Sequence, residues 1–131
     1  MPKNKFVTEF EVNASQKILF PYLSTASGLA QWFAEDVNIN EDKVYSFLWD
    51  GEEHKATKAS QKTNHFVKFE FVPETEEDEE DPSYIELRLM IGELTQSVFI
   101  QITDYSDIDD PEEQQDLWEN TVHNLKEIIG G

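Results

Sequence analysis

Residues 10–37, FEVNASQKILFPYLSTASGLAQWFAEDV, join a strand pattern directly to a helical one. The strand pattern extends back to residue 5, because apolar and polar side chains alternate over residues 5–13. Asn13, followed three residues later by Gln16, resembles a capping box. It predicts a helix that runs from there through about residue 23.

A second short helix is expected over residues 27–33, because Ser24 or Thr25 can cap its amino terminus. It carries three large apolar side chains, those of Leu29, Trp32 and Phe33. Two short helices are therefore expected after the first strand.

Downstream of this stretch the pattern changes to period two, which indicates a meander of strands. Six strands are expected, over residues 36–39, 43–50, 53–60, 65–72, 83–91 and 94–103. Short turns, among them Asp50-Gly51, favour antiparallel pairing. We expect one face to be covered and the other to face water. The face predicted to be covered carries Val67, Phe69, Phe71, Ile85, Leu87, Leu89, Ile91, Val98, Ile100 and Ile102.

The end of the chain predicts a long helix over residues 111–129. Asp110 is its expected N-cap, Pro111 its first residue, and Gly130 lies just past its end. At about 1.5 Å per residue such a helix is long enough to cross a sheet. Its predicted apolar stripe is Leu117, Trp118, Thr121, Val122, Leu125, Ile128 and Ile129.

These elements in this order predict an α+β helix-grip fold in a single domain, residues 1–131. We expect a curved seven-stranded antiparallel sheet with two short helices after strand 1 and a long C-terminal helix packed across the sheet. Its most distinctive segment is Leu29, Trp32 and Phe33 in the context of residues 10–37, supported by FLWDG at residues 47–51.

On these residues the chain resembles the START-like (SRPBCC) superfamily, and within it the branch homologous to the activator of heat shock protein 90 ATPase. The resemblance implies a cavity between the C-terminal helix and the sheet, which related domains use for lipids or other hydrophobic ligands. It also implies a possible chaperone-type partner, but no residue here matches a chaperone-contact motif. The chain is far more acidic than is usual for that branch.

Charge and composition exclude several classes of function. The 131 residues include 10 Lys plus Arg and 28 Asp plus Glu, a net charge of −18. This charge disfavours nucleic acid and anionic membranes as partners. The absence of cysteine excludes disulfides, thiolate nucleophiles and zinc-thiolate sites. Because no long apolar run occurs, we expect a cytoplasmic protein without membrane insertion.

The acidic segment Glu74–Asp81, ETEEDEED, is the one stretch of low complexity. Its like charges repel, so a solvated loop over residues 73–82 is expected. A surface for a basic protein partner is the alternative interpretation.

The candidate ligand-binding residues are mostly large apolar side chains expected on the inner face of the sheet and on the C-terminal helix. They are Trp32, Phe33, Trp49, His54, Phe69, Phe71, Leu87, Leu89, Val98, Ile100, Trp118, Val122 and Leu125. Trp32 and Phe33 are expected near the mouth of the cavity. The inward polar candidates are Thr8, Ser46, His54 and Gln96. The alternative is that these apolar side chains fill the core and leave no cavity.

Three functions follow from these observations. The first is a non-enzymatic module that binds a small hydrophobic molecule or lipid. The second is a protein-interaction or co-chaperone-like module that uses the acidic loops 73–82 and 104–113 against a basic partner. The third is a small hydrolase or cyclase with His54 as a base. No catalytic residue, cofactor or metal is assigned, because the sequence contains no recognisable nucleophile, phosphate-loop or metal-ligand motif.

Overall fold

The computed structural model describes residues 3–130 and has the predicted α+β architecture. In chain order its elements are β1 (Asn4–Val12), α1 (Gln16–Ser24), α2 (Ala26–Leu29), β2 (Asp36–Ile39), β3 (Val44–Trp49), β4 (Glu52–Lys62), β5 (Phe66–Phe71), α3 (Glu76–Glu80), β6 (Tyr84–Ile91), β7 (Val98–Ser106) and α4 (Pro111–Ile129). The predicted curved seven-stranded sheet, short helices and long C-terminal helix are confirmed.

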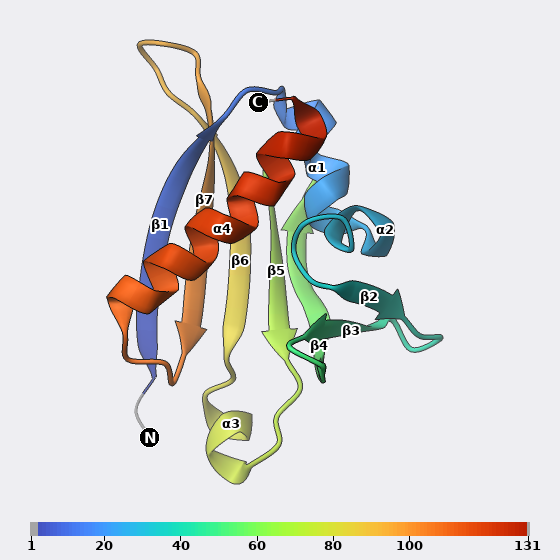
Figure 1. Cartoon of the computed structure of the whole chain (residues 1–131). Helices are drawn as coiled ribbons and strands as arrows, with labels where there is room; N and C mark the ends of the chain where they lie inside the picture. Colours follow the sequence, from blue (N-terminus) through green and yellow to red (C-terminus); the bar gives the residue numbers. More distant parts are fainter. Residues whose placement is uncertain (1–2, 131) are drawn as a thin grey trace.

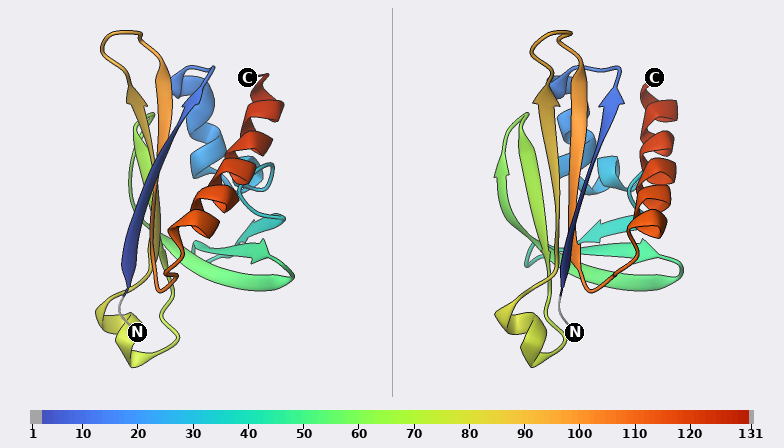
Figure 2. Two further views of the ribbon diagram at one scale, coloured as in Figure 1. Left: turned by 60° about the vertical axis from the view of Figure 1, so that its left-hand side comes forward. Right: turned by 90° about the vertical axis from the view of Figure 1, so that its left-hand side faces the viewer.

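All strand pairs are antiparallel, and the strand order is β1-β7-β6-β5-β4-β3-β2. The sheet is strongly curved, and α1, α2 and α4 lie on its concave side (Figure 2). The long helix α4 crosses this side diagonally, from the paired ends of β1 and β7 towards α1 (Figure 1). The space between α4 and the sheet is therefore the interior of the molecule.

The start of α1 differs from the predicted capping box at Asn13 and Gln16. The N-cap is Ser15, whose Oγ accepts a hydrogen bond from the backbone N–H of Ile18 at 3.2 Å. A tight turn, in which the Ala14 N–H donates to the Val12 carbonyl, follows β1 and delays the helix. Asn13 therefore lies outside the helix. The second helix is also shorter than predicted, and Thr25 is confirmed as its cap.

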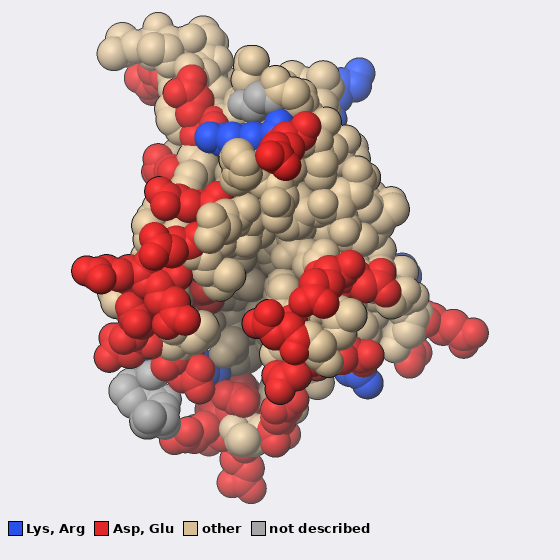
Figure 3. All heavy atoms as spheres, in the orientation of Figure 1, with Lys and Arg blue, Asp and Glu red and all other residues tan. Residues whose placement is uncertain are grey.

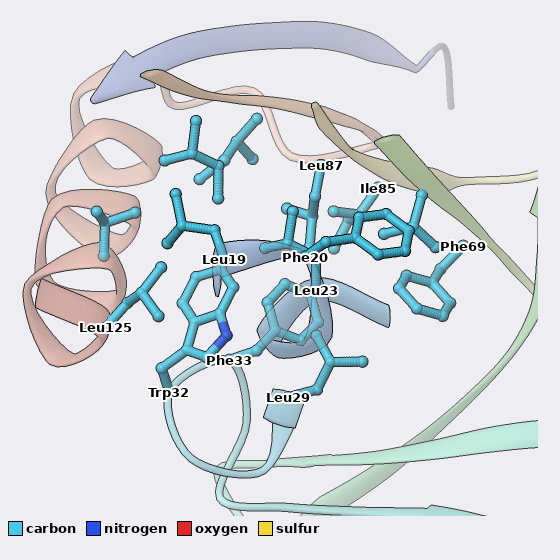
Figure 4. Close-up of a cluster of buried hydrophobic side chains, with 14 of the residues drawn as sticks. Leu19, Phe20, Leu23, Leu29, Trp32, Phe33, Phe69, Ile85, Leu87 and Leu125 are labelled. Atoms are coloured by element: carbon cyan, nitrogen blue, oxygen red, sulfur yellow. The ribbon is translucent and has the colours of Figure 1, made fainter. Parts of the chain in front are cut away.

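The core fills the space under α1 and the carboxyl-terminal half of α4. Side chains from α1, α2, α4 and the central strands converge there, as labelled in Figure 4. The predicted inner face of the sheet is confirmed except for Ile91, which is 48% exposed near the end of β6.

The buried stripe of α4 is narrower than predicted and begins one turn earlier, at Gln114. Leu117 and Ile128, both expected inside, are 54% and 38% exposed, whereas Gln114 is buried. The buried residues Gln114, Trp118, Val122 and Leu125 follow helical spacing along one side. The helix thus presents a narrower stripe to the sheet than the sequence pattern predicts.

The last strand begins and ends later than predicted. Residues 92–97 form a hairpin loop, closed by hydrogen bonds from the Gly92 N–H to the Ser97 carbonyl and from the Gln96 N–H to the Gly92 carbonyl. The strand β7 therefore begins at Val98, and it extends to Ser106, which pairs with Asn4 of β1. Asp104, which was assigned to an acidic loop, is instead a buried strand residue.

The acidic segment contains a short helix, α3, where a loop was expected. Thr75 caps it by accepting a hydrogen bond from the Asp78 N–H at 3.1 Å. Lys3 fastens this helix to the start of β1: its Nζ lies 3.0 Å from Asp78 Oδ1 and also donates to the Asp81 carbonyl. On the other side, the Tyr105 hydroxyl donates to Asp81 Oδ2 at 2.7 Å.

Candidate functional site

A cleft of about 620 Å³ opens between the amino-terminal half of α4, the β3–β4 hairpin and the strand ends beside α3. In the space-filling view this face of the molecule is hollowed, with carboxylates on both sides of the hollow (Figure 3). The cleft occupies the end of the interlayer space that the core does not fill.

Seven of the sixteen residues that line the cleft are apolar. Its apolar lining residues are Trp49, Phe71, Val72, Ile85, Ile108, Leu117 and Trp118. Trp49 is held in place because its Nε1 donates to the Phe33 carbonyl at 2.8 Å, and its ring packs against Phe47 and Phe71. The aromatic wall is therefore built by side chains of fixed orientation.

A second, smaller cavity of about 270 Å³ lies against the same wall. It is lined by Phe33, Glu35, Trp49, Asp50, Leu117, Trp118 and Thr121. Trp49, Leu117 and Trp118 line both spaces, so a movement of these side chains would change the shape of both. Leu117 is half exposed, which fits a position at the rim of the two spaces.

The polar lining is mainly acidic. The charged and titratable side chains around the cleft are Glu53, His54, Lys55, Glu74, Asp78, Asp104 and Asp107. Lys55 is largely exposed, and its Nζ lies 4.0 Å from Glu53 Oε1. Carboxylates therefore dominate the electrostatic character of the cleft.

Asp104 is the most deeply placed of these carboxylates, only 6% exposed. Its Oδ2 accepts hydrogen bonds from Trp118 Nε1 at 3.2 Å and from Gln114 Nε2 at 3.3 Å. Asp104 thereby ties the first half of α4 to β7. The same contacts orient the Trp118 indole that walls the cleft.

Two titrating groups near the cleft are shifted by their contacts with α3. The hydrogen bond from Lys3 lowers the pKa of the Asp78 carboxyl. The hydrogen bond to Asp81 raises the pKa of the Tyr105 hydroxyl. Both shifts arise from the contacts that fasten α3, so they report on the position of this helix.

The structure divides the predicted ligand-binding residues between the cleft and the core. Trp49, His54, Phe71 and Trp118 line the large cleft, and Phe33 lines the smaller cavity. The buried core holds Trp32, Phe69, Leu87, Leu89, Ile100, Val122 and Leu125. Val98 packs against that core and is partly buried. The role of all these residues in binding stays a prediction.

Trp32 illustrates the division. It was expected near the mouth, but it is 3% exposed, and its Nε1 donates to the Tyr22 carbonyl at 2.8 Å. Both the open cavity and the filled core are thus present, in different parts of the same interlayer space.

Of the four inward polar candidates, Thr8 and His54 lie on the inner side of the sheet, whereas Ser46 and Gln96 do not. Thr8 is buried and donates to Gln115 Oε1 at 2.8 Å, and His54 lies 5.3 Å, centroid to centroid, from Trp49. Ser46 lies between buried Tyr45 and Phe47, so it faces the opposite side of the sheet. Gln96 lies in the β6–β7 loop, with a positive φ of 59°.

Sequence reasoning missed Asp104, Ile108 and Leu117 as cleft residues. Asp104 was missed because β7 was expected to end at residue 103. The signal that could have found it is parity: Ile100, Ile102 and Asp104 continue one alternating series. Ile108 follows the strand in a loop, where no periodic signal exists.

The described residues, 3–130, contain no candidate metal site. No cluster of three or more His, Cys, Asp or Glu side chains in this range could hold a metal ion. None of the helices described is long and apolar enough to cross a membrane.

Comparisons with known proteins agree with this architecture. A family model described as a START-like superfamily domain matches residues 1–131. A solution structure of a protein from Bacteroides fragilis is 31% identical, with 98% of this chain and 93% of that chain covered and a TM-score of 0.62. No curated protein sequence matches the chain.

Two more distant structures share the fold. The Aha1 dimer from Colwellia psychrerythraea is 17% identical, with 94% of this chain and 93% of that chain covered and a TM-score of 0.73. A protein of the dynemicin biosynthetic locus is 14% identical, with 98% of this chain and 48% of that chain covered and a TM-score of 0.72. At these identities the likeness shows a shared fold.

Proposed function

Because the chain belongs to the START-like superfamily, whose domains commonly bind hydrophobic ligands, we propose that it binds a small hydrophobic molecule in the cleft beside the start of α4. The observation that carries this proposal is the wall formed by Trp49, Phe71 and Trp118 around a space of about 620 Å³. Ligand pockets are typically concave, mostly apolar and roughly 300 to 1,000 Å³ in volume. The cleft is concave and lies within this volume range, and seven of its sixteen lining residues are apolar.

The packing of the core limits where the ligand lies. Between the second half of α4 and the sheet, side chains such as Leu87, Ile100 and Leu125 are fully buried against one another. The ligand therefore occupies the end of the interlayer space near Trp118, and its exposed side faces the acidic rim.

Native mass spectrometry of the protein purified from its own cells tests the proposal, followed by solvent extraction of any bound molecule. We expect a stoichiometric hydrophobic adduct. A titration with the neutral dye Nile red, followed by dye fluorescence, provides a second readout that does not depend on a ligand surviving purification.

Two variants of α4 make this titration specific. Leu117 and Ile128 are both partly exposed apolar residues of the same helix, but of the two only Leu117 lines the cleft. We expect Leu117→Gln to weaken Nile red binding several-fold and Ile128→Gln to leave it unchanged. Equal affinities for both variants and the wild type, together with a mass spectrum free of adduct, would contradict the proposal.

A basic protein partner is the second candidate, favoured by the carboxylates that flank the cleft (Figure 3). Every residue of α3 is acidic and none is buried. Replacing Glu76, Glu79 and Glu80 by Gln keeps Asp78 and its contact with Lys3 intact. We expect this triple variant to bind a nonalysine peptide more weakly by calorimetry than a control with Glu11, Glu41 and Glu93 replaced. Equal affinities would count against the acidic helix as a docking surface.

The third hypothesis, a hydrolase or cyclase with His54 as base, stays a prediction. Its support is the position of His54 in the cleft, against Trp49. If His54→Ala leaves ligand binding and every measured activity unchanged, the hypothesis should be abandoned.

A further inference from the structure

Asp104 has one carboxylate oxygen that no hydrogen bond uses. Both of its hydrogen bonds, from Trp118 Nε1 and Gln114 Nε2, end on Oδ2. Oδ1 accepts none from residues 3–130. Because no fully buried side-chain oxygen in that range lacks a partner, Oδ1 must be accessible. Asp104 lines the cleft, so the small exposed part of this residue, 6% in all, faces the cleft.

The charge of Asp104 is also uncompensated. Both donors on Oδ2 are neutral, and no ion pair within the described range involves this carboxylate. Lys55 is the one lysine among the lining residues of the cleft, and it pairs with none of its carboxylates except Glu53, at 4.0 Å. A buried carboxylate without a cation is costly, whereas a neutral amide would accept the same two hydrogen bonds.

The surroundings of Oδ1 suit a cation attached to an apolar body. Indole and phenyl rings of Trp49, Phe71 and Trp118 can attract a cation through their faces as well as bury hydrocarbon. Glu53, Glu74 and Asp107 add negative potential around the opening. The same charges repel an anionic head group such as a fatty acid carboxylate.

We propose that the ligand of this cleft is a hydrophobic amine, with its ammonium group on Asp104 Oδ1 and its apolar part against Trp49, Phe71 and Leu117. The inference rests on the proposed function and names the chemical class of its ligand. Primary amines have pKa values near that of lysine, about 10, and therefore carry the required charge at pH 7.

A purely structural role for Asp104 is the competing explanation, since it fastens Trp118 and Gln114 of α4 to β7. This role predicts no preference among ligand head groups. The amine hypothesis predicts a strong preference that disappears with the charge of Asp104. Ligand head groups therefore distinguish the two explanations.

Three probes with one apolar body make the test: 4-phenylbutylamine, 4-phenylbutan-1-ol and 4-phenylbutanoate. Their dissociation constants are measured by calorimetry at pH 7, in 0.5 M NaCl. At this ionic strength the Debye length is about 4 Å, so the general attraction of an acidic protein for cations is suppressed. We expect the amine to bind at least tenfold more tightly than the alcohol, and the carboxylate most weakly.

The isosteric variant Asp104→Asn removes the charge and keeps an acceptor for Trp118. We expect it to weaken amine binding at least tenfold, to the level of the alcohol, while alcohol binding is unchanged. The matched control is Asp42→Asn, in the exposed β2–β3 turn, which should leave the amine preference intact. If Asp104→Asn does not fold, the comparison of amine and alcohol binding by the wild type still distinguishes the amine ligand from a purely structural role of Asp104.

The outcomes separate this inference from the proposed function. Equal binding of amine and alcohol by the wild type, or an amine preference that survives Asp104→Asn, would overturn the amine inference and leave a hydrophobic site. Binding of none of the three probes would overturn the amine inference, and the Nile red titration then decides whether the proposed hydrophobic site remains.

Discussion

Gly28 allows the two short helices after β1 to pack closely. A Cβ built at this position would lie 2.2 Å from the Pro21 carbonyl oxygen and 2.7 Å from the Tyr22 Cα. Both atoms belong to the backbone of α1 and cannot move independently of the helix. Glycine is thus required here by the close approach of α2 to α1.

We predict that Gly28→Ala destabilises the protein by about 1 to 3 kcal/mol or more, because the methyl group must push α1 and α2 apart. Urea unfolding followed by tryptophan fluorescence measures this change. The control is Gly92→Ala, where an added Cβ would meet the side chains of Phe99 and Thr95 at 3.3 Å. If Gly28→Ala lowers the free energy of unfolding no more than Gly92→Ala does, the two helices can separate without cost.

At the scale of elements, the acidic helix α3 depends on a contact far away in the sequence. Lys3 pairs with Asp78, and the Lys3 side chain is almost completely covered, with 6% of it exposed. This pair, together with the Tyr105–Asp81 hydrogen bond, fixes a segment whose charges would otherwise keep it extended and solvated. The ordering of α3 is therefore an effect of tertiary structure.

Lys3→Met should return the pKa of Asp78 towards its ordinary value of 3.8, because the hydrogen bond from Lys3 is the main cause of its lowering. Since the folded pKa lies below the unfolded one, the pair stabilises the protein fully above about pH 4 and is lost as the pH falls below that value. An NMR titration of the side-chain carboxyl carbons measures the shift. An Asp78 pKa that is the same in both proteins would exclude the proposed contact.

The bounds of β7 decide the chemistry of the cleft. Had the strand ended at residue 103, Asp104 would be a solvated loop residue with no influence on a ligand. Its place within β7, opposite Phe6 and Ile85, puts its side chain on the inner face. A strand extended by three residues thus converts a surface charge into a buried one.

At the scale of the whole molecule, the net charge of −18 opposes compaction. Few cations offset it locally, and carboxylates lie on both sides of the cleft (Figure 3). Their mutual repulsion falls with salt, since the Debye length is roughly 30 Å at 0.01 M and about 8 Å at 0.15 M ionic strength.

We therefore predict that the thermal unfolding midpoint rises by several degrees between 10 and 150 mM NaCl and changes little beyond that range. Calorimetry in NaCl and in KCl checks this prediction, because screening does not distinguish the two salts. A midpoint that falls with either salt would contradict a dominant role for charge repulsion.

The types and order of the seven strands and of α1, α2 and α4 were determined by the sequence alone, whereas α3 was not predicted. Alternation over the strands, helical spacing in residues 111–129 and the caps at Asp110 and Gly130 act over a few residues, so they can be recognised without the fold. The α+β helix-grip class followed from their order, and the START-like family followed from the resemblance carried by residues 10–37 and 47–51. The exact bounds of α1, α2 and β7 did not follow, because turns and hairpin hydrogen bonds fix them.

Only the tertiary structure decided which inner-face side chains are core and which line a cleft. Phe69 and Phe71 occupy the same face of β5, two residues apart, yet Phe69 is fully buried and Phe71 lines the opening. Alternation assigns both to one face and cannot separate them. The curvature of the sheet and the diagonal path of α4 separate them, because a straight helix covers a curved sheet closely only along part of its length.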